Sequence, residues 1–370
     1  MNNIQQIATQ GQPEQVPTGT VQHNLLNIKP TSTEIYHLWS TYIAYSMACA
    51  MQKHMTAKSQ DPDLKNVLQN ALDSSSRNIQ RMEELFKTIQ YPIPNAFGEK
   101  DVDINAPALF EEIYCVKYTR LMTKSILINH SRAFGDCTRS DFIDLFGIFI
   151  DDSRRIIRLA DDVLLAKGLL QKSPTLSVPD KVDYIHDKNY YGSFWGSGRP
   201  LNSMEINNIY TLINFKNAMK TLKLGFAQVV KSDKLKKHLI RGIKMAEKQL
   251  KVLGSMLKKE RLPEPTAMDL WVTDSKESPY SERLMMFHVT ITLAYIVSYY
   301  GLGLTNSLRK DVILSFSRLM LEVMDYIKDG TDLLIENGWM EKVPGTVDRQ
   351  ELIHTTFPAV NSCLILEKSI

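Results

Sequence analysis

The 370-residue sequence lacks the motifs that usually identify an enzyme. It contains no Gly-rich phosphate loop, no Gly-x-Ser-x-Gly turn and no Cys/His nucleophile arrangement. Cysteine is scarce, and the four residues show no Cys-x-x-Cys spacing, so neither a zinc site nor a disulfide framework is supported. We expect free thiols in a reducing cytoplasm. The four cysteines are Cys49, Cys115, Cys137 and Cys363.

The sequence also lacks an excess of charge of one sign. Its net charge is +3, and its 44 Lys and Arg residues are scattered among 41 Asp and Glu residues. Because binding to a phosphate backbone needs a basic face, we expect no nucleic-acid partner. The N-terminus has no basic and then apolar leader, so we do not expect secretion by a standard signal.

What the sequence does contain is an internal repeat with a shift of roughly 170 residues. Tyr91-Pro-Ile-Pro94 matches Leu262-Pro-Glu-Pro265, and Arg139-Ser-Asp141 matches Arg309-Lys-Asp311. Prolines and glycines occupy matching places between apolar stretches, so the two copies should share element boundaries. One structural unit is therefore used twice.

Apolar residues at helical spacing predict four helices in each copy, and no strand pattern competes with them. The first helix of each copy is predicted to begin at a capping box, Thr31-x-x-Glu34 or Asn202-x-x-Glu205. Proline pairs end the second helix, and the third helix is expected to start near Pro107 and Pro279. We predict an all-α fold made of two tandem antiparallel four-helix bundles.

The composition predicts five segments. The connector between the bundles is rich in glycine and aromatic residues, and a merely flexible tether would be polar. Its aromatic side chains are predicted to fill the seam between the bundles, with a partner-binding patch as the alternative. These side chains are Tyr190, Tyr191, Phe194 and Trp195. The segments are a disordered tail (1–28), the first bundle (29–180), the connector (181–201), the second bundle (202–352) and a C-terminal tail (353–370).

Long hydrophobic runs are rare, and one needs weighing as a membrane span. Leu284 to Leu308 carries no Asp, Glu, Lys or Arg and is long enough to cross a bilayer. The matching stretch of the first copy is interrupted by four basic residues, and equivalent elements of a duplicated fold should share one environment. We therefore expect a buried core helix and no membrane span. The four basic residues are Lys117, Arg120, Lys124 and Arg132.

A four-helix bundle can hold a pair of metal ions bridged by carboxylates, which needs Glu from two helices and Glu-x-x-His from the two others. The first copy has one such spacing, Glu34-x-x-His37, where the second has Glu205-x-x-Asn208. Neither copy completes a ligand set. We therefore predict no catalytic residue and no cofactor, and we keep Glu34 and His37 as weak candidates for binding iron or manganese.

Two amides occupy matching inward positions on the second helix of each copy, Asn78 and Gln249. Without hydrogen-bond partners, each would cost about 1 to 3 kcal/mol. We interpret them as satisfied amides, with a residual binding pocket or a metal ligand as alternatives. His288, on the most apolar helix, is interpreted as a core histidine. Together with Glu34 and Glu205, these residues form the candidate buried polar cluster.

Several runs resemble a double-repeat family of Bacillus-type spore formers that is catalogued as a domain of unknown function. The resemblance covers about residues 28 to 352. The runs that carry it are Tyr91-Pro-Ile-Pro94, Asp101-Val-Asp103 with Asn105-Ala-Pro107, Gly196 to Leu201, Tyr280-Ser-Glu-Arg-Leu-Met-Met-Phe287, Ser317-Arg-Leu-Met320 and Glu336-Asn-Gly-Trp-Met-Glu341.

The resemblance implies a ferritin-like bundle in each repeat, a loose link to spore-coat-type proteins and no known enzyme activity. Members of that family often carry a histidine on the second helix of each repeat, where this chain has Asn78 and Gln249. Our leading hypothesis is a non-enzymatic structural or interaction protein, cytoplasmic or associated with the spore coat, with protein partners or self-association. The alternatives are a ferritin-like metal-binding or oxidase-type protein and a small-molecule carrier with a cavity between helices.

Overall fold

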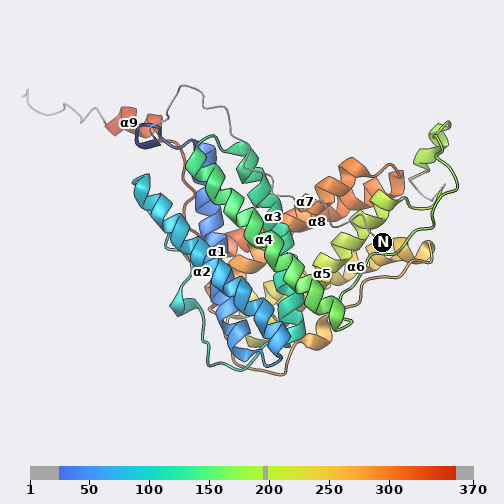
Figure 1. Ribbon diagram of the computed structural model, residues 1–370, viewed down its shortest axis with the longest axis horizontal. Helices are drawn as coiled ribbons and strands as arrows, with labels where there is room; N and C mark the ends of the chain where they lie inside the picture. Colours follow the sequence, from blue (N-terminus) through green and yellow to red (C-terminus); the bar gives the residue numbers. More distant parts are fainter. Residues whose placement is uncertain (1–24, 195–198, 356–370) are drawn as a thin grey trace, which may run out of the picture.

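The computed structural model describes residues 25–194 and 199–355 (Figure 1). The predicted N-terminal tail up to residue 24, the last residues of the C-terminal tail, Trp195 and Cys363 lie outside this range. The described part is all-α, with eight long helices in two sets of four, as predicted. The helices are α1 (Ser32–Lys58), α2 (Pro62–Thr88), α3 (Glu112–Asp136), α4 (Ser140–Ala166), α5 (Ser203–Val229), α6 (Asp233–Lys259), α7 (Glu282–Asn306) and α8 (Lys310–Glu336).

The two copies repeat helix for helix. Helix α5 is the counterpart of α1, and α7 is the counterpart of α3, with the same length in each pair. Figure 1 shows the first set of helices at the left and the second set extending to the right. The short elements are η1 (Leu25–Asn27), η2 (Glu99–Asp101), η3 (Lys188–Tyr191), η4 (Asp269–Trp271) and α9 (Arg349–Thr355).

The helix ends follow from local sequence. Both predicted capping boxes are present, at Thr31 with Glu34 and at Asn202 with Glu205. Gln90 and Arg261, just beyond the ends of α2 and α6, adopt positive φ angles of 54° and 58°. A left-handed residue stops a helix because the chain can no longer continue the helical hydrogen bonds. These helices therefore end before the proline pairs are reached.

The predicted starts of the third helices near Pro107 and Pro279 are wrong by a few residues, because α3 and α7 begin at Glu112 and Glu282. The α2–α3 and α6–α7 connections instead run extended and pair with each other. Val102 pairs antiparallel with Tyr280.

The second pairing, between Phe110 and Val272, is the counterpart of the first. Val272 occupies the position of Val102 in the other copy, and Tyr280 occupies the position of Phe110. The two pairings therefore join the same two positions of the repeat, with the copies exchanged. Four backbone hydrogen bonds of 2.8 to 3.1 Å join the two connections. The seam between the copies thus has approximate twofold symmetry, and these connections form part of it together with residues of α3, α5 and α7.

The aromatic connector does not fill this seam, which corrects the sequence-based prediction. Tyr191 and Phe194 are 44% and 52% exposed. Tyr190 is half-buried, and the Arg199 guanidinium lies 4.0 Å from the centre of its ring. Because the two paired connections occupy the seam, the described connector aromatics remain at the surface.

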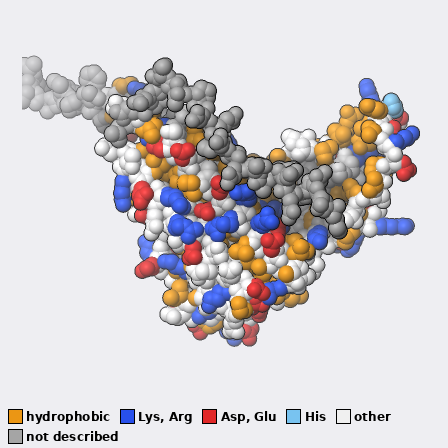
Figure 2. All heavy atoms as spheres, in the orientation of Figure 1, with side chains coloured by type: hydrophobic (Ala, Val, Ile, Leu, Met, Phe, Trp, Pro, Cys, Tyr) orange, Lys and Arg blue, Asp and Glu red, His pale blue; other side chains and the backbone are white. Residues whose placement is uncertain are grey.

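Helix α7 carries the long apolar run. Among the described residues it is the one helix whose length and composition would allow it to cross a membrane, and 61% of its most apolar stretch is buried inside the fold. Its buried side chains include Leu284, Met286 and Leu293. This burial is what a core helix requires. On the face drawn in Figure 2, basic and acidic side chains are interspersed.

Candidate functional site

Glu34 lies at the start of α1 and is fully buried. Its carboxylate accepts hydrogen bonds from the backbone amides of Thr31 (2.7 Å), Thr138 (2.9 Å) and Arg139 (2.9 Å). Burial alone would raise the pKa of this carboxyl, but these hydrogen bonds lower the pKa to about 2. Glu34 therefore joins the start of α1 to the loop between α3 and α4.

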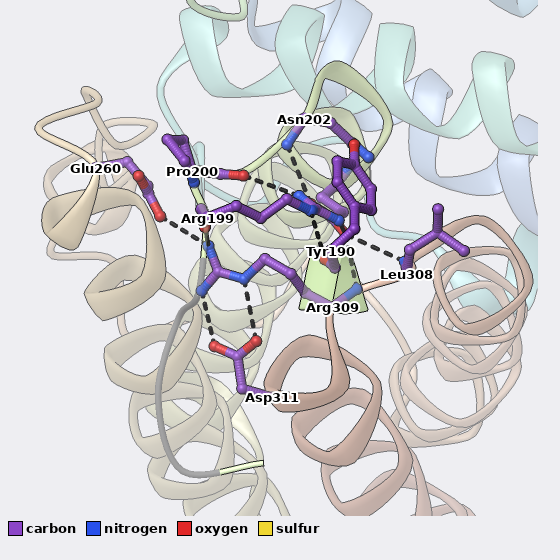
Figure 3. Close-up of polar contacts among 9 residues, drawn as sticks. Tyr190, Arg199, Pro200, Asn202, Glu260, Leu308, Arg309 and Asp311 are labelled. Atoms are coloured by element: carbon purple, nitrogen blue, oxygen red, sulfur yellow. Dashed lines mark hydrogen bonds and ion pairs between the residues drawn. The ribbon is translucent and has the colours of Figure 1, made fainter. Parts of the chain in front are cut away.

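Glu205 does the same in the second copy. It accepts the backbone amides of Leu308 (3.1 Å) and Arg309 (3.0 Å), and Arg199 binds both of its oxygens at 2.8 Å (Figure 3). Arg309 extends the network by donating to Asp311 at 2.7 Å. The pKa of the Glu205 carboxyl is lowered because these hydrogen bonds outweigh the effect of burial.

His37 is not brought to the Glu34 carboxylate as a joint metal site. Its Nε2 atom lies 3.2 Å from Asp136 Oδ2, while the Glu34 oxygens are engaged by backbone amides. Within residues 25–194 and 199–355, no group of three or more His, Cys, Asp and Glu side chains is placed to hold a metal ion. The two weak metal candidates therefore have separate partners.

Asn78 belongs to a polar layer inside the first bundle to which all four helices contribute. Its side-chain amide donates to Asp152 Oδ2 (3.1 Å) and to Tyr45 Oη (3.3 Å), and its oxygen accepts from Arg81 (2.7 Å). His130 from α3 stacks on Tyr45, with 5.6 Å between ring centres. Burial lowers the pKa of His130 to about 3, so this imidazole is neutral.

Gln249 belongs to the equivalent layer of the second bundle. Its nitrogen donates to Glu322 Oε2 (3.0 Å), and its oxygen accepts from Tyr300 Oη (3.1 Å) and from Lys216 Nζ. Lys216 is 2% exposed, and its Nζ atom lies 5.0 Å from the centre of the Tyr300 ring. Burial lowers the pKa of Lys216 well below its ordinary value. This second layer therefore contains a buried lysine nitrogen that donates to Gln249.

The members of the two layers are equivalent. Positions 45, 78, 130 and 152 of the first copy correspond to positions 216, 249, 300 and 322 of the second. Tyr45 is thus replaced by Lys216 and His130 by Tyr300. The sequence interpretation of Asn78 and Gln249 as satisfied amides agrees with these contacts. It missed Tyr45, Lys216 and Tyr300, which could have been found by reading every inward position of one copy against the other.

His288 lies at the seam between the copies. Its Nε2 atom is hydrogen bonded to Tyr118 Oη, and its Nδ1 atom lies 3.2 Å from the sulfur of Met47. His288 and Tyr118 occupy the same position in the two copies, so equivalent residues meet at the approximate twofold axis. Burial lowers the pKa of His288 to about 3, and the ring nitrogen of a neutral imidazole can accept a hydrogen bond from the Tyr118 hydroxyl.

A cavity of about 90 Å³ adjoins this histidine and tyrosine. Thr119 lines it, and its hydroxyl, in a side chain that is 2% exposed, has no hydrogen-bond partner among the described residues. Gln52 also lines the cavity with a buried, unpartnered amide oxygen. Two residues of the cavity lining, which also includes other hydroxyl side chains and His288, thus carry unpartnered polar atoms that could meet a small molecule.

The five candidates of the predicted polar cluster are all buried, but they lie in five separate contact networks. Two lie at the starts of α1 and α5, two lie in the interiors of the two bundles, and one lies at the seam between the copies. They do not form a single cluster, because the repeat distributes equivalent residues over two bundles. The five are Glu34, Glu205, Asn78, Gln249 and His288.

Comparison with known proteins places the chain among its relatives. A solved structure of a candidate spore coat protein from Bacillus halodurans is similar at 17% sequence identity and a TM-score of 0.38, over 40% of this chain and 98% of that chain. No curated protein matches. A family model described as a protein of unknown function, DUF3231, matches residues 22–182 and again residues 191–352. The chain therefore belongs to the DUF3231 family and carries two tandem copies of its domain.

Proposed function

We infer that this protein is a non-enzymatic structural or interaction protein. The observation that carries this proposal is that the amides of both interior polar layers are bound by protein groups, while the buried Nε2 atom of His130 in the first layer has no partner among the described residues. In the second bundle the Lys216 side chain places its Nζ atom next to Gln249, at the level where ligands from four helices of a bundle would converge. In the first bundle Arg81 and Asp152 bind the Asn78 amide.

The rival function is that of a ferritin-like metal-binding or oxidase-type protein. It needs carboxylates and imidazoles that are free to bind a metal ion. The contacts of Glu34 and of Gln249 oppose it, because each group is already bound by amides, hydroxyls or the Lys216 nitrogen. His130 offers a neutral, unpartnered Nε2 atom, but within the described residues no group of three or more ligating side chains surrounds it. A robust catalytic turnover that disappears on changing Asn78→Ala would overturn the non-enzymatic proposal.

Association with the spore coat is the second part of the proposal, and it rests on the family resemblance. The test is to follow a fluorescent fusion through sporulation and to extract the coat fraction of the resulting spores. The proposal expects the full-length protein in the coat fraction. If the protein stays in the mother-cell cytoplasm and is missing from that fraction, spore association is wrong, while the non-enzymatic assignment is tested separately by turnover.

A small-molecule carrier remains a second candidate because of the seam cavity beside Thr119. The cavity, at about 90 Å³, is smaller than an engineered cavity of about 150 Å³ that binds benzene or xenon. Xenon and isobutanol are suitable probes, with chemical shifts measured by NMR. The carrier function expects Thr119→Val to weaken isobutanol binding and leave xenon binding unchanged. Equal effects on both probes would contradict it.

A further inference from the structure

The basic residues that interrupt α3 in the sequence line a second pocket, distinct from the polar layers and from the seam cavity. Lys117, Arg120 and Lys124 recur at spacings of three and four residues, which puts them on one face of α3. The pocket has a volume of about 80 Å³ and lies between the two copies. Its other walls come from the segment after α4, from α5 and from Met268.

The positive charge of this pocket is compensated in part by one carboxylate, Asp161, which attracts both Arg120 and Lys124. Arg120 forms an ion pair with Asp161. Lys117 and Lys124 form no ion pair or hydrogen bond with any residue of the described chain. The Lys117 ammonium lies 4.5 Å from the centre of the Trp271 ring, a contact that holds the side chain in place but does not neutralise it. Burial and the neighbouring Arg120 lower the pKa of Lys117.

The remaining lining indicates the size and the character of a ligand. The polar side chains Thr211 and Asn214 of α5 line the pocket, and so does Gln171, whose buried oxygen has no partner among the described residues. The oxygen and nitrogen of a side-chain amide are told apart only by their hydrogen bonds. A half-turn of the Gln171 amide would therefore point its N–H donors toward an anion in the pocket. Leucine side chains provide an apolar wall: Leu121, Leu164, Leu169 and Leu170.

The pocket belongs to the first copy alone. In the second copy the positions equivalent to the three basic side chains are occupied by Phe287, Thr290 and Ala294. The repeat therefore does not require these charges for folding, because the second copy packs without them. A group of cations that is absent from the equivalent element and that lines a pocket between the bundles is suited to binding an anion.

We propose that this pocket binds a small carboxylate whose oxygens face Lys117, Arg120 and Lys124 and whose short alkyl part lies against the leucine wall. A carboxylate fits because it combines one negative charge with an apolar chain, and cationic side chains bind carboxylates through strong charge-assisted hydrogen bonds. Because the pocket is lined from both copies, the ligand would connect the two bundles. This inference is independent of the proposed structural role.

The test is a titration of the full-length protein with propionate at low ionic strength, followed by calorimetry. Lys124→Met removes one cation, and the loss of one charged hydrogen bond is expected to weaken binding about tenfold or more. Lys124→Arg keeps the charge and should stay within about threefold of the wild type. Lys251→Met, at an exposed position on α6, is the matched control and should bind as the wild type does.

Three outcomes would overturn the proposal. Propionate binding that does not saturate would remove the site. An equal loss in Lys124→Met and Lys251→Met would mean that propionate responds only to net charge. Inorganic phosphate binding more tightly than propionate would refute the carboxylate assignment, because the leucine wall would then contribute nothing. The circular dichroism spectrum of each variant verifies that it is folded.

Discussion

The substitution Glu34→Gln tests whether a buried carboxylate holds the first bundle together. The carboxylate accepts five hydrogen bonds, from Thr31, Thr138 and Arg139. Glutamine has the same shape but keeps only one acceptor oxygen. Its NH₂ group would face backbone N–H donors, with which it cannot form a hydrogen bond. Lowering the pKa from 4.5 to about 2 corresponds to about 3 kcal/mol of stability at pH 7. We therefore expect Glu34→Gln to cost about 3 kcal/mol at neutral pH.

The lowered pKa of Glu34 also predicts how the stability cost of Glu34→Gln changes with pH. The pKa of Glu34 is lower in the folded state than in the unfolded chain, so the stabilisation is fully present above about pH 4.5 and is lost as the pH falls toward 2. The difference between wild type and Glu34→Gln should shrink from about 3 kcal/mol at pH 7 to about 2 kcal/mol at pH 3.5.

Urea denaturation followed by circular dichroism at several pH values measures this difference. The matched control is Glu247→Gln on α6, an exposed glutamate, which should change stability by less than about 0.5 kcal/mol at every pH. A cost for Glu34→Gln below about 1 kcal/mol at pH 7, or one that does not fall in acid, would refute the reasoning.

Three further predictions concern packing and burial, and thermal or urea unfolding measures each. Gly242→Ala should destabilise by about 1 to 3 kcal/mol, because its Cβ would lie 2.2 Å from Tyr326 Oη. The control Gly301→Ala, with open space around it, should be neutral or stabilising. Equal effects of the two substitutions would contradict this prediction. Lys223→Met should stabilise by about 2 to 3 kcal/mol at pH 7, because burial lowers the pKa of Lys223 from 10.5 to about 8. That penalty disappears as pH rises from about 8 to 10.5, so a pH-independent difference would refute it. Thr119→Val should stabilise by about 1 kcal/mol by removing an unpartnered hydroxyl, and a loss of stability would mean that the hydroxyl has a partner.

The sequence predicted those parts of the fold that depend on local chemistry. The capping boxes at Thr31 and Asn202 and the duplicated set of helices are confirmed, because capping and helical periodicity act within a few residues of the chain. The starts of α3 and α7 were placed too early. The reason is that the preceding residues pair with the other copy, and no local pattern reports a contact between segments so far apart in the sequence.

The interior polar layers show the same limit. Lys216 reads as a surface lysine in the sequence, and its burial depends on acceptors and a ring that other helices supply. Asn78 and Gln249 were recognised as inward because both copies place an amide on the same helical face. The connector aromatics were misjudged, since composition alone cannot tell which of two segments fills the seam.

The proposed function requires that the amides inside both bundles be bound by the protein's own groups. Elemental analysis of protein purified at near-neutral pH, without chelators and without a histidine tag, tests it most directly. We expect protein free of stoichiometric iron, manganese and zinc, with a native mass that equals the mass of the polypeptide or of its oligomers. A metal near one per chain that is lost in Glu34→Ala or Asp152→Ala would contradict the account and establish the ferritin-like alternative.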